Sequence, residues 1–334
     1  MTEGQDPIER VMGRSRDLYD IATWDERTLL DTVSVRLTGL LKMSSRLLLV
    51  FTAVLIIVAQ LALTGFAVVR NPLLGGLTLL SVVPAALLVG YIWYDDPTLR
   101  QSLRSLVMTF VLGVLFAGFA AIVNTALSGL FGLIPVVGLA LYFFLVVGPV
   151  EELVKWLAVR LYAFRSIEFH AVIDGAVYGA VAGLGFATIE NAIYITRVYL
   201  EVASVGVNVV PSTINIASVR LLAGPGHVIY SAFAGYYLGL AKFNPENRGP
   251  IVVKGLLIAA LVHGLYNTLV SYLPRVIPFG LPVFVAFILV YDGVLLTVLF
   301  RKLSRYQDAY HEALRIGDEA GGEAEGETER PSSA

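Results

Sequence analysis

Apolar stretches of about 20 residues recur along this chain, and they constrain its fold more than any other feature. A helix of that length can cross the roughly 30 Å hydrocarbon core of a bilayer. Eight such stretches are present: Leu47–Val69, Leu73–Tyr94, Leu106–Val123, Val136–Phe164, Ala171–Ile195, Leu221–Ala241, Ile251–Leu273 and Phe279–Phe300. The sequence therefore predicts an all-α fold, a polytopic membrane bundle of about eight transmembrane helices.

Composition agrees with a membrane protein and excludes several chemistries. The chain is 57% hydrophobic and only 15% charged, with a mean hydropathy of +0.75, well outside the soluble average. Its net charge of −2 and the lack of a basic cluster argue against nucleic acid as a partner. The chain has no cysteine, so disulfides, thiolate metal sites and a cysteine nucleophile are excluded. The first apolar stretch follows a long polar segment, which favours a retained span over a cleaved signal peptide.

The distribution of arginine and lysine predicts the orientation. Loops on the cytoplasmic side of a membrane protein are enriched in these residues. Alternate loops and both flanks carry most of them: Arg27, Arg36, Lys42, Arg46, Arg100, Arg104, Arg160, Arg165, Lys242, Arg248, Arg301, Lys302 and Arg305. The opposite loops carry only Arg70, Arg197, Arg220 and Arg275. Both termini are therefore expected to be cytoplasmic, in a multi-pass protein of the cell membrane that contacts the lipid bilayer.

The two ends of the chain are expected to lie outside the membrane. Residues 1–45 form a cytoplasmic amphipathic segment, in which Thr23 and Glu26 fit a capping box at the start of a helix. That helix can lie on the membrane surface or pack on its own bundle, and the pattern does not choose between them. Residues 46–305 form the bundle. Residues 306–334 comprise a cytoplasmic helix end and a disordered acidic tail that starts at about Gly317.

Three charged residues stand together inside the fourth apolar stretch. Each ionised side chain at the bilayer centre costs roughly 2.5–3.5 kcal/mol on insertion scales, so such residues usually serve a function. In a helix, Lys155 can pair with either Glu151 or Glu152, because they lie four and three residues before it. The two glutamates point about 100° apart and should differ in role. One can meet substrate or water as a general base while Lys155 holds the other. The alternative is a buried ion pair that only joins two helices.

Further polar residues interrupt the later stretches. Glu190 follows a series of small residues that allow close helix packing: Gly175, Gly179, Ala180, Gly183 and Gly185. His227 follows Gly224-Pro225-Gly226, which we expect to be a flexible or broken helix start. His263 and Asn267 lie one turn apart on a single helix face, where they can hold a water or stabilise an oxyanion. Asp174, near a cytoplasmic helix end, is expected to be structural, and Asp292 is a further acid within a span.

Several intramembrane chemistries can be checked by motif. A zinc helix of the His-Glu-x-x-His type is absent. The Gly-x-Gly-Asp motif of a membrane aspartyl protease is absent, although Tyr291-Asp292 is present, and no serine fits a serine-protease motif. Glutamate and histidine remain, with a metal or a bare water as the source of the nucleophile. The main alternative is a proton-coupled secondary transporter, which also buries acids and histidines at mid-depth. Against it, the two halves of the chain show no convincing internal repeat.

The ordered motifs resemble a known family. Pro149-Val150-Glu151-Glu152-Leu153-Val154-Lys155, Gly185-Phe186-Ala187-Thr188-Ile189-Glu190-Asn191, His227 and His263-Gly264-Leu265-Tyr266-Asn267 are similar to the motifs of PrsW family intramembrane proteases. That family is similar in turn to the CAAX prenyl endopeptidases and Abi proteins. Glu190 stands where the prenyl-protease pattern has histidine, which argues against prenylated substrates. The resemblance covers about residues 130–275, the expected catalytic core. It implies an endopeptidase that cleaves membrane-anchored protein substrates.

The sequence thus predicts the residues of an active site. Glu151, Glu152, Lys155, His263 and Asn267 are the candidate catalytic residues. Glu152, Glu190, His227 and His263 are the candidate metal ligands, with zinc as the candidate metal. A metal-free mechanism, in which Glu151 or Glu152 deprotonates water directly, remains open. Glu190 and His227 fall towards the non-cytoplasmic ends of their spans, so cleavage is expected in the outer half of the bilayer. The oligomeric state is left open.

Overall fold

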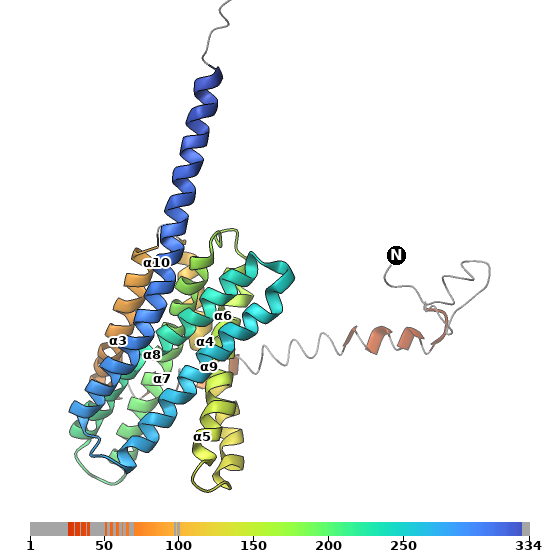
Figure 1. The fold of residues 1–334 in the computed structure, drawn as a ribbon. Helices are drawn as coiled ribbons and strands as arrows, with labels where there is room; N and C mark the ends of the chain where they lie inside the picture. The colour runs from red at the N-terminus through yellow and green to blue at the C-terminus, as the bar shows by residue number, and fades with distance from the viewer. Residues whose placement is uncertain are drawn as a thin grey trace, which may run out of the picture. The chain divides into compact units, whose positions relative to one another are not determined.

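The computed structural model describes residues 26–29, 31–33, 35–37, 39–40, 51, 54–55, 58–59, 62, 65–66, 70–96, 98 and 101–328. Over these residues the regular secondary structure is entirely helical, as predicted, with no strand. The chain divides into two compact units, Met1–Ile56 and Ile57–Ala334. The second unit contains the long helices (Figure 1). Every candidate site residue also lies in this unit.

From Pro72 to Thr328, seven helical runs follow one another. They are α3 (Pro72–Tyr94), α4 (Leu103–Gly132), a combined run of α5 (Gly138–Tyr142), a π-helical turn η2 (Phe143–Val147) and α6 (Gly148–Leu161), then α7 (Val172–Ser204), α8 (Val209–Lys242), α9 (Arg248–Tyr272) and α10 (Leu281–Thr328). Short 3₁₀ turns follow α6 and α9 and precede α9.

Five helical segments in the described part of the chain are long and apolar enough to cross a membrane, fewer than the predicted eight. They are Pro72–Tyr94, Leu103–Gly132, Val172–Ser204, Pro245–Arg275 and Leu281–Glu312. The predicted span Leu47–Val69 lies largely outside the described residues. The predicted fourth span is helical but divided into α5, η2 and α6, of which the longest, α6, has 14 residues. The predicted sixth span lies in α8, which carries Arg220 and His227 of the candidate site. The fourth apolar stretch is long enough to need either a tilt or a bent entry at Pro135, and the structure has a turn there, between α4 and α5.

The expected helix break at Gly224-Pro225-Gly226 is wrong. The helix α8 runs without interruption from Val209 to Lys242 and contains Pro225 in its interior. Proline removes one backbone hydrogen bond from a helix, which a membrane helix tolerates when its neighbours pack around the bend. Gly226 lies against the Tyr230 side chain one turn later. A broken helix here would be the kind of discontinuity that carriers use, so the continuous α8 removes one argument for a transporter.

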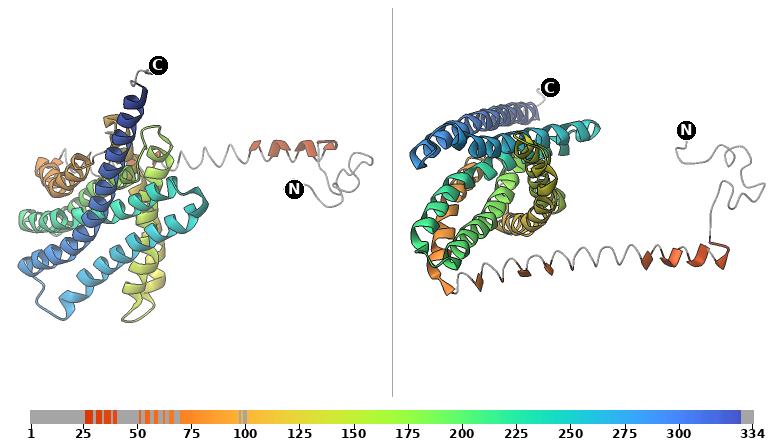
Figure 2. Two further views of the ribbon diagram at one scale, coloured as in Figure 1. Left: turned by 45° about the horizontal axis from the view of Figure 1, so that its top comes forward. Right: turned by 90° about the horizontal axis from the view of Figure 1, so that it is seen from below.

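The helices α7 and α8 form the centre of the bundle. In α7, 89% of the most apolar segment is buried, against 22–33% in the other four candidate spans. Around this pair, α3 packs against both helices, α4 packs against α7, and α9 and α10 pack against α8 (Figure 2). Outward residues of the surrounding helices are large and apolar, for example Leu79, Leu87 and Leu289, which suits a surface facing lipid.

Glycines allow α7 and α8 to pack closely, as predicted. A Cβ atom added at Gly179 would lie 2.2 Å from the carbonyl oxygen of Ser231 on α8, and one at Gly183 would lie 2.4 Å from the carbonyl oxygen of His227. Any side chain there would force the two helices apart. This small-residue contact brings Glu190, two turns after Gly183, alongside the turn of α8 that carries His227.

The two ends of the described chain differ in detail from expectation. Thr23 of the expected capping box lies outside the described residues. The structure instead shows a capping box at Thr28 and Asp31: the Thr28 hydroxyl accepts a bond from the Asp31 amide (3.2 Å), and the Asp31 carboxylate accepts one from the Thr28 amide (2.7 Å). At the other end, α10 continues as helix to Thr328, into the segment for which we expect disorder. Propagating an existing helix avoids the nucleation cost that a new helix carries.

Candidate active site

A cavity of about 650 Å³ lies between the helices and contains most of the predicted site residues. Glu151, Glu190, His227, His263 and Asn267 all line it. They come from α6, α7, α8 and α9, so helices far apart in sequence meet at one place. Glu152 and Lys155 are buried just behind the wall, with fully covered side chains. The structure therefore gathers every predicted catalytic and metal-binding residue at this cavity.

Glu152 is the centre of a buried polar cluster. One of its oxygens, Oε1, accepts from Lys155 Nζ (2.6 Å) and lies 2.8 Å from His263 Nδ1. The other oxygen, Oε2, accepts from the Ser231 hydroxyl at 3.3 Å. Because the carboxylate can only accept, His263 must carry its proton on Nδ1, which turns Nε2 towards the cavity. Glu152 thus holds His263 in one tautomer and one orientation.

Glu190 holds the second histidine in a similar way. Its Oε2 lies 2.8 Å from His227 Nε2 and also accepts from the guanidinium of Arg220. Arg220 in turn donates to the Asn191 side chain at 2.8 Å, and Asn191 is tied to Ser81 of α3. The other ring nitrogen of His227, Nδ1, lies 3.0 Å from Lys155 Nζ. Both nitrogens of His227 are therefore engaged by charged neighbours.

Glu151 is the least constrained of the three glutamates. Its Oε1 accepts from the Asn124 side-chain amide at 3.0 Å. Its Oε2 is buried and has no hydrogen-bond partner among the residues that the structure describes. That oxygen lies 3.7 Å from His263 Nε2, too far for a hydrogen bond. A buried carboxylate oxygen is costly to leave without a partner, so this atom is suited to receive a water or a cation.

Local structure explains why α6 presents Glu151 and Glu152 at this place. The π-helical turn at Phe143–Val147 immediately precedes α6 and changes the phase of the helix, a feature common at functional sites. Gly148 then allows close contact with α9, since a Cβ there would lie 2.5 Å from the carbonyl oxygen of Ala260. Ala260 is one turn before His263. The close approach of α6 and α9 therefore brings the paired glutamates within reach of the imidazole ring.

Three of these residues could hold a metal ion together. One ligand atom each from Glu151, His227 and His263 lies within 4.8 Å of the other two, and all three residues are buried. Imidazole and carboxylate are ligands that zinc takes, and at normal bond lengths its ligand atoms are about 3.3 Å apart. The 3.7 Å between Glu151 and His263 is already close to this value. To bind the ion, one ring nitrogen of His227 would have to give up its contact with Lys155 or Glu190. The donor set fits a metal site after a small closing movement.

The other acids within the bundle have separate places. Asp174 accepts from the backbone amides of His170 (2.6 Å) and Ala171 (2.9 Å) and from the Gln101 side chain (2.7 Å). It therefore caps the start of α7, in the structural role that we expected. Asp292 is buried on α10 but does not line the cavity.

Two residues of the site were missed by sequence reasoning. Arg220 was counted as a loop residue, because the sixth span was expected to begin at Leu221, but α8 begins twelve residues earlier and carries Arg220 within it. Asn124 lies just beyond the third predicted span, which ends at Val123, whereas α4 continues to Gly132. For Arg220 the detectable signal was a charged side chain with apolar neighbours on both sides, Val219 and Leu221.

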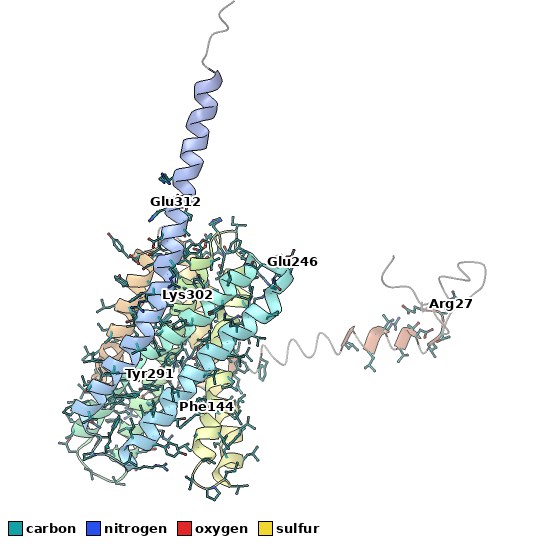
Figure 3. The ribbon with its side chains drawn as sticks, in the orientation of Figure 1. Arg27, Phe144, Glu246, Tyr291, Lys302 and Glu312 are labelled. Carbon is teal, nitrogen blue, oxygen red and sulfur yellow. The ribbon has the colours of Figure 1, made fainter. Side chains whose placement is uncertain are left out.

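The cavity lies in one half of the bundle. Its lining comes mostly from the C-terminal halves of α4, α7 and α9, the N-terminal halves of α8 and α10, and the chain from the end of α5 through η2 to the first turn of α6. These parts lead to the connections at residues 133–137, 205–208 and 276–280. Glu246, between α8 and α9, lies at the opposite end, and Phe144 lies towards the cavity half (Figure 3). By the distribution of arginine and lysine, the cavity half is the predicted non-cytoplasmic one.

Comparison with known proteins agrees with this arrangement. Residues 101–291 match the PrsW family of intramembrane metalloproteases. Protease PrsW of Halalkalibacterium halodurans is 29% identical over 191 residues, which cover 57% of this chain and 80% of that protein. Protease PrsW of Geobacillus kaustophilus is 30% identical over 57% of this chain and 77% of the relative, and that of Bacillus subtilis is 28% identical over 60% and 86%. No solved structure matches the chain. With its cluster of glutamates and histidines enclosed by apolar helices, the chain belongs to the PrsW family and is an intramembrane protease.

Proposed function

We propose that this protease is a multi-pass protein of the cell membrane, with both termini in the cytoplasm, and that Glu151 is its general base. The observation that carries the proposal is the convergence of Glu151, His227 and His263 at one buried cavity. The substrates are membrane-anchored proteins, whose chain would enter the cavity from the bilayer. The unpartnered oxygen of Glu151 is the site at which a water would bind.

The proposed chemistry is hydrolysis of a peptide bond by an activated water. Glu151 Oε2 accepts the proton of the attacking water and later delivers it to the leaving amine. His263, oriented by Glu152, presents Nε2 to the reacting group. Asn267 lies one turn after His263 on the same wall of the cavity, where its amide can donate to the tetrahedral oxyanion.

The remaining charged residues hold these groups in place. Lys155 neutralises Glu152, and Arg220 neutralises Glu190, so each histidine is held by a carboxylate that is itself paired. Carboxylates in this position orient metal-binding histidines in many proteins. We therefore assign Glu152 and Glu190 to orientation, and His227 and His263 to holding the metal, with Glu151 facing a water between its free oxygen and the ion. A zinc ion bound there would polarise the scissile carbonyl and make a water more acidic.

The cavity's place in the bundle supports cleavage in the outer half of the membrane. The lining helices contribute mostly the half that leads to a predicted non-cytoplasmic connection. A bond cleaved there would lie near the outer end of a substrate's transmembrane segment or just beyond it.

A reporter substrate co-expressed with single variants tests the proposal. Glu151→Gln should lower cleavage about 10²–10⁴-fold, the usual contribution of a general base, and His263→Ala should abolish it. Glu246→Gln and His311→Ala are matched controls, since both residues are exposed and far from the cavity along the chain, and both should cleave normally. Chelator treatment of the purified enzyme should abolish activity and added zinc should restore it. Normal cleavage by Glu151→Gln at equal protein level would disprove its role as base.

A further inference from the structure

Asn124, on α4, contacts the proposed base directly but belongs to none of the motifs that mark the site. Its side-chain amide donates to Glu151 Oε1 at 3.0 Å. A carboxylate can only accept, so the amide nitrogen and not the amide oxygen must face Glu151. The two residues are 27 positions apart, on helices joined through the turn at residues 133–137.

The backbone at Asn124 is itself fixed. The Tyr142 hydroxyl, from the last residue of α5, donates to the carbonyl oxygen of Asn124 at 2.9 Å. This bond ties α4 to the chain just before the π-helical turn that leads to Glu151. The backbone from which the Asn124 side chain reaches Glu151 is therefore fixed relative to α5.

The two oxygens of Glu151 are consequently not equivalent. Oε1 is held by Asn124, whereas Oε2 has no hydrogen-bond partner in the described structure and lies 3.7 Å from His263 Nε2. Without the amide, the carboxylate could rotate about its last side-chain torsion and direct either oxygen anywhere in the cavity. A base that must meet one water, or one ion, in a fixed place loses efficiency when it can rotate.

We propose that Asn124 is a positioning residue, which anchors one oxygen of Glu151 so that the other faces His263 and His227. This inference rests on the proposed role of Glu151. It extends the functional site to α4, which contributes none of the residues identified from the sequence. Loss of an outer-shell partner of this kind typically lowers activity or metal affinity by 10–100-fold.

The test uses Asn124→Leu and the near-isosteric Asn124→Asp in the full-length enzyme, with kcat expressed per folded molecule. Both variants should lose about 10–100-fold in kcat, with KM within threefold of the wild-type value. Asn124→Asp should be at least as impaired as Asn124→Leu, because it removes the donor and places a second carboxylate beside Glu151. A residue that served packing alone would show the reverse order, since aspartate keeps its shape.

Zinc affinity gives a readout that does not depend on cleavage. Competition with a chelator should show about 10-fold weaker zinc binding in both Asn124 variants. Asn244→Leu is the matched control: Asn244 is exposed, donates only to the Leu240 carbonyl at the end of α8, and should leave kcat and zinc affinity unchanged. Values of kcat and zinc affinity within twofold of wild type in both Asn124 variants would overturn the inference. If the wild-type enzyme itself fails to cleave, the proposed function fails instead, and the zinc measurement still decides the role of Asn124.

Discussion

The ion pair between Arg220 and Glu190 gives a quantitative test of how the site is held. Their side chains are only 11% and 19% exposed, and Arg220 also donates to Asn191. Removing one partner of a buried pair typically costs about 3–5 kcal/mol, because the remaining charge loses its compensation. Glu190 keeps its 2.8 Å contact with His227 and borders the cavity, so some of this cost is relieved. We expect Arg220→Met to lower the free energy of unfolding by about 2–4 kcal/mol.

An exposed ion pair on α7 provides the control. Arg197 and Glu201 are four residues apart on α7, and their side chains are 72% and 59% exposed. Exposed pairs at this spacing contribute about 0.3–0.5 kcal/mol. Arg197→Met should therefore change the free energy of unfolding by less than about 1 kcal/mol. The same substitution is thus compared in a buried pair and in an exposed pair of one protein.

The measurement is reversible unfolding in mixed detergent micelles, followed by circular dichroism. A double-mutant cycle with Glu190→Gln separates the pair's own interaction energy, which should exceed about 1 kcal/mol. The reasoning is refuted if Arg220→Met costs no more than Arg197→Met, or if the coupling to Glu190 is below about 0.3 kcal/mol, the usual error of additivity.

Two further predictions concern packing and pH. Gly179→Ala should destabilise the fold by about 1–3 kcal/mol, because the new Cβ would meet a backbone carbonyl of α8 at 2.2 Å. Gly90→Ala is the control, because a Cβ at Gly90 would have nothing within 4 Å. In the same unfolding assay it should be neutral or stabilise the fold by up to about 1 kcal/mol. The hydroxyls of Ser105 and Ser102 donate to Glu168, in the connection between α6 and α7, and lower its pKa. Because the pKa of Glu168 is lower in the folded state than in the unfolded state, where it is roughly 4.3, these bonds stabilise the fold at higher pH. This stabilisation is lost as the pH falls through the pKa of the folded state. The thermal midpoint of the wild type should therefore fall more steeply below about pH 4.3 than that of Glu168→Gln, and parallel curves would contradict the assignment.

Much of the architecture and most of the candidate site could be predicted from the chain alone. The long apolar stretches determine a helical membrane protein, because a backbone in lipid must satisfy its hydrogen bonds within each segment. The charged and imidazole side chains within those stretches indicate the site, because each is too costly at that depth without a partner. The glycines of α7 indicate close packing, since only small residues let two backbones approach. Each of these inferences depends on properties local to one segment.

The division of labour within the site was decided by contacts between segments that are far apart in sequence. Glu151 and Glu152 are adjacent and chemically identical, and only their neighbours distinguish them. Glu152 meets Lys155 and His263 in the interior, whereas Glu151 meets Asn124 and leaves one oxygen facing the cavity. The phase of α6 that separates them depends on the π-helical turn before it, for which the sequence carries no clear pattern. Spacing along a helix predicts which residues share a face, but which partner that face meets is set by the packing of the whole bundle.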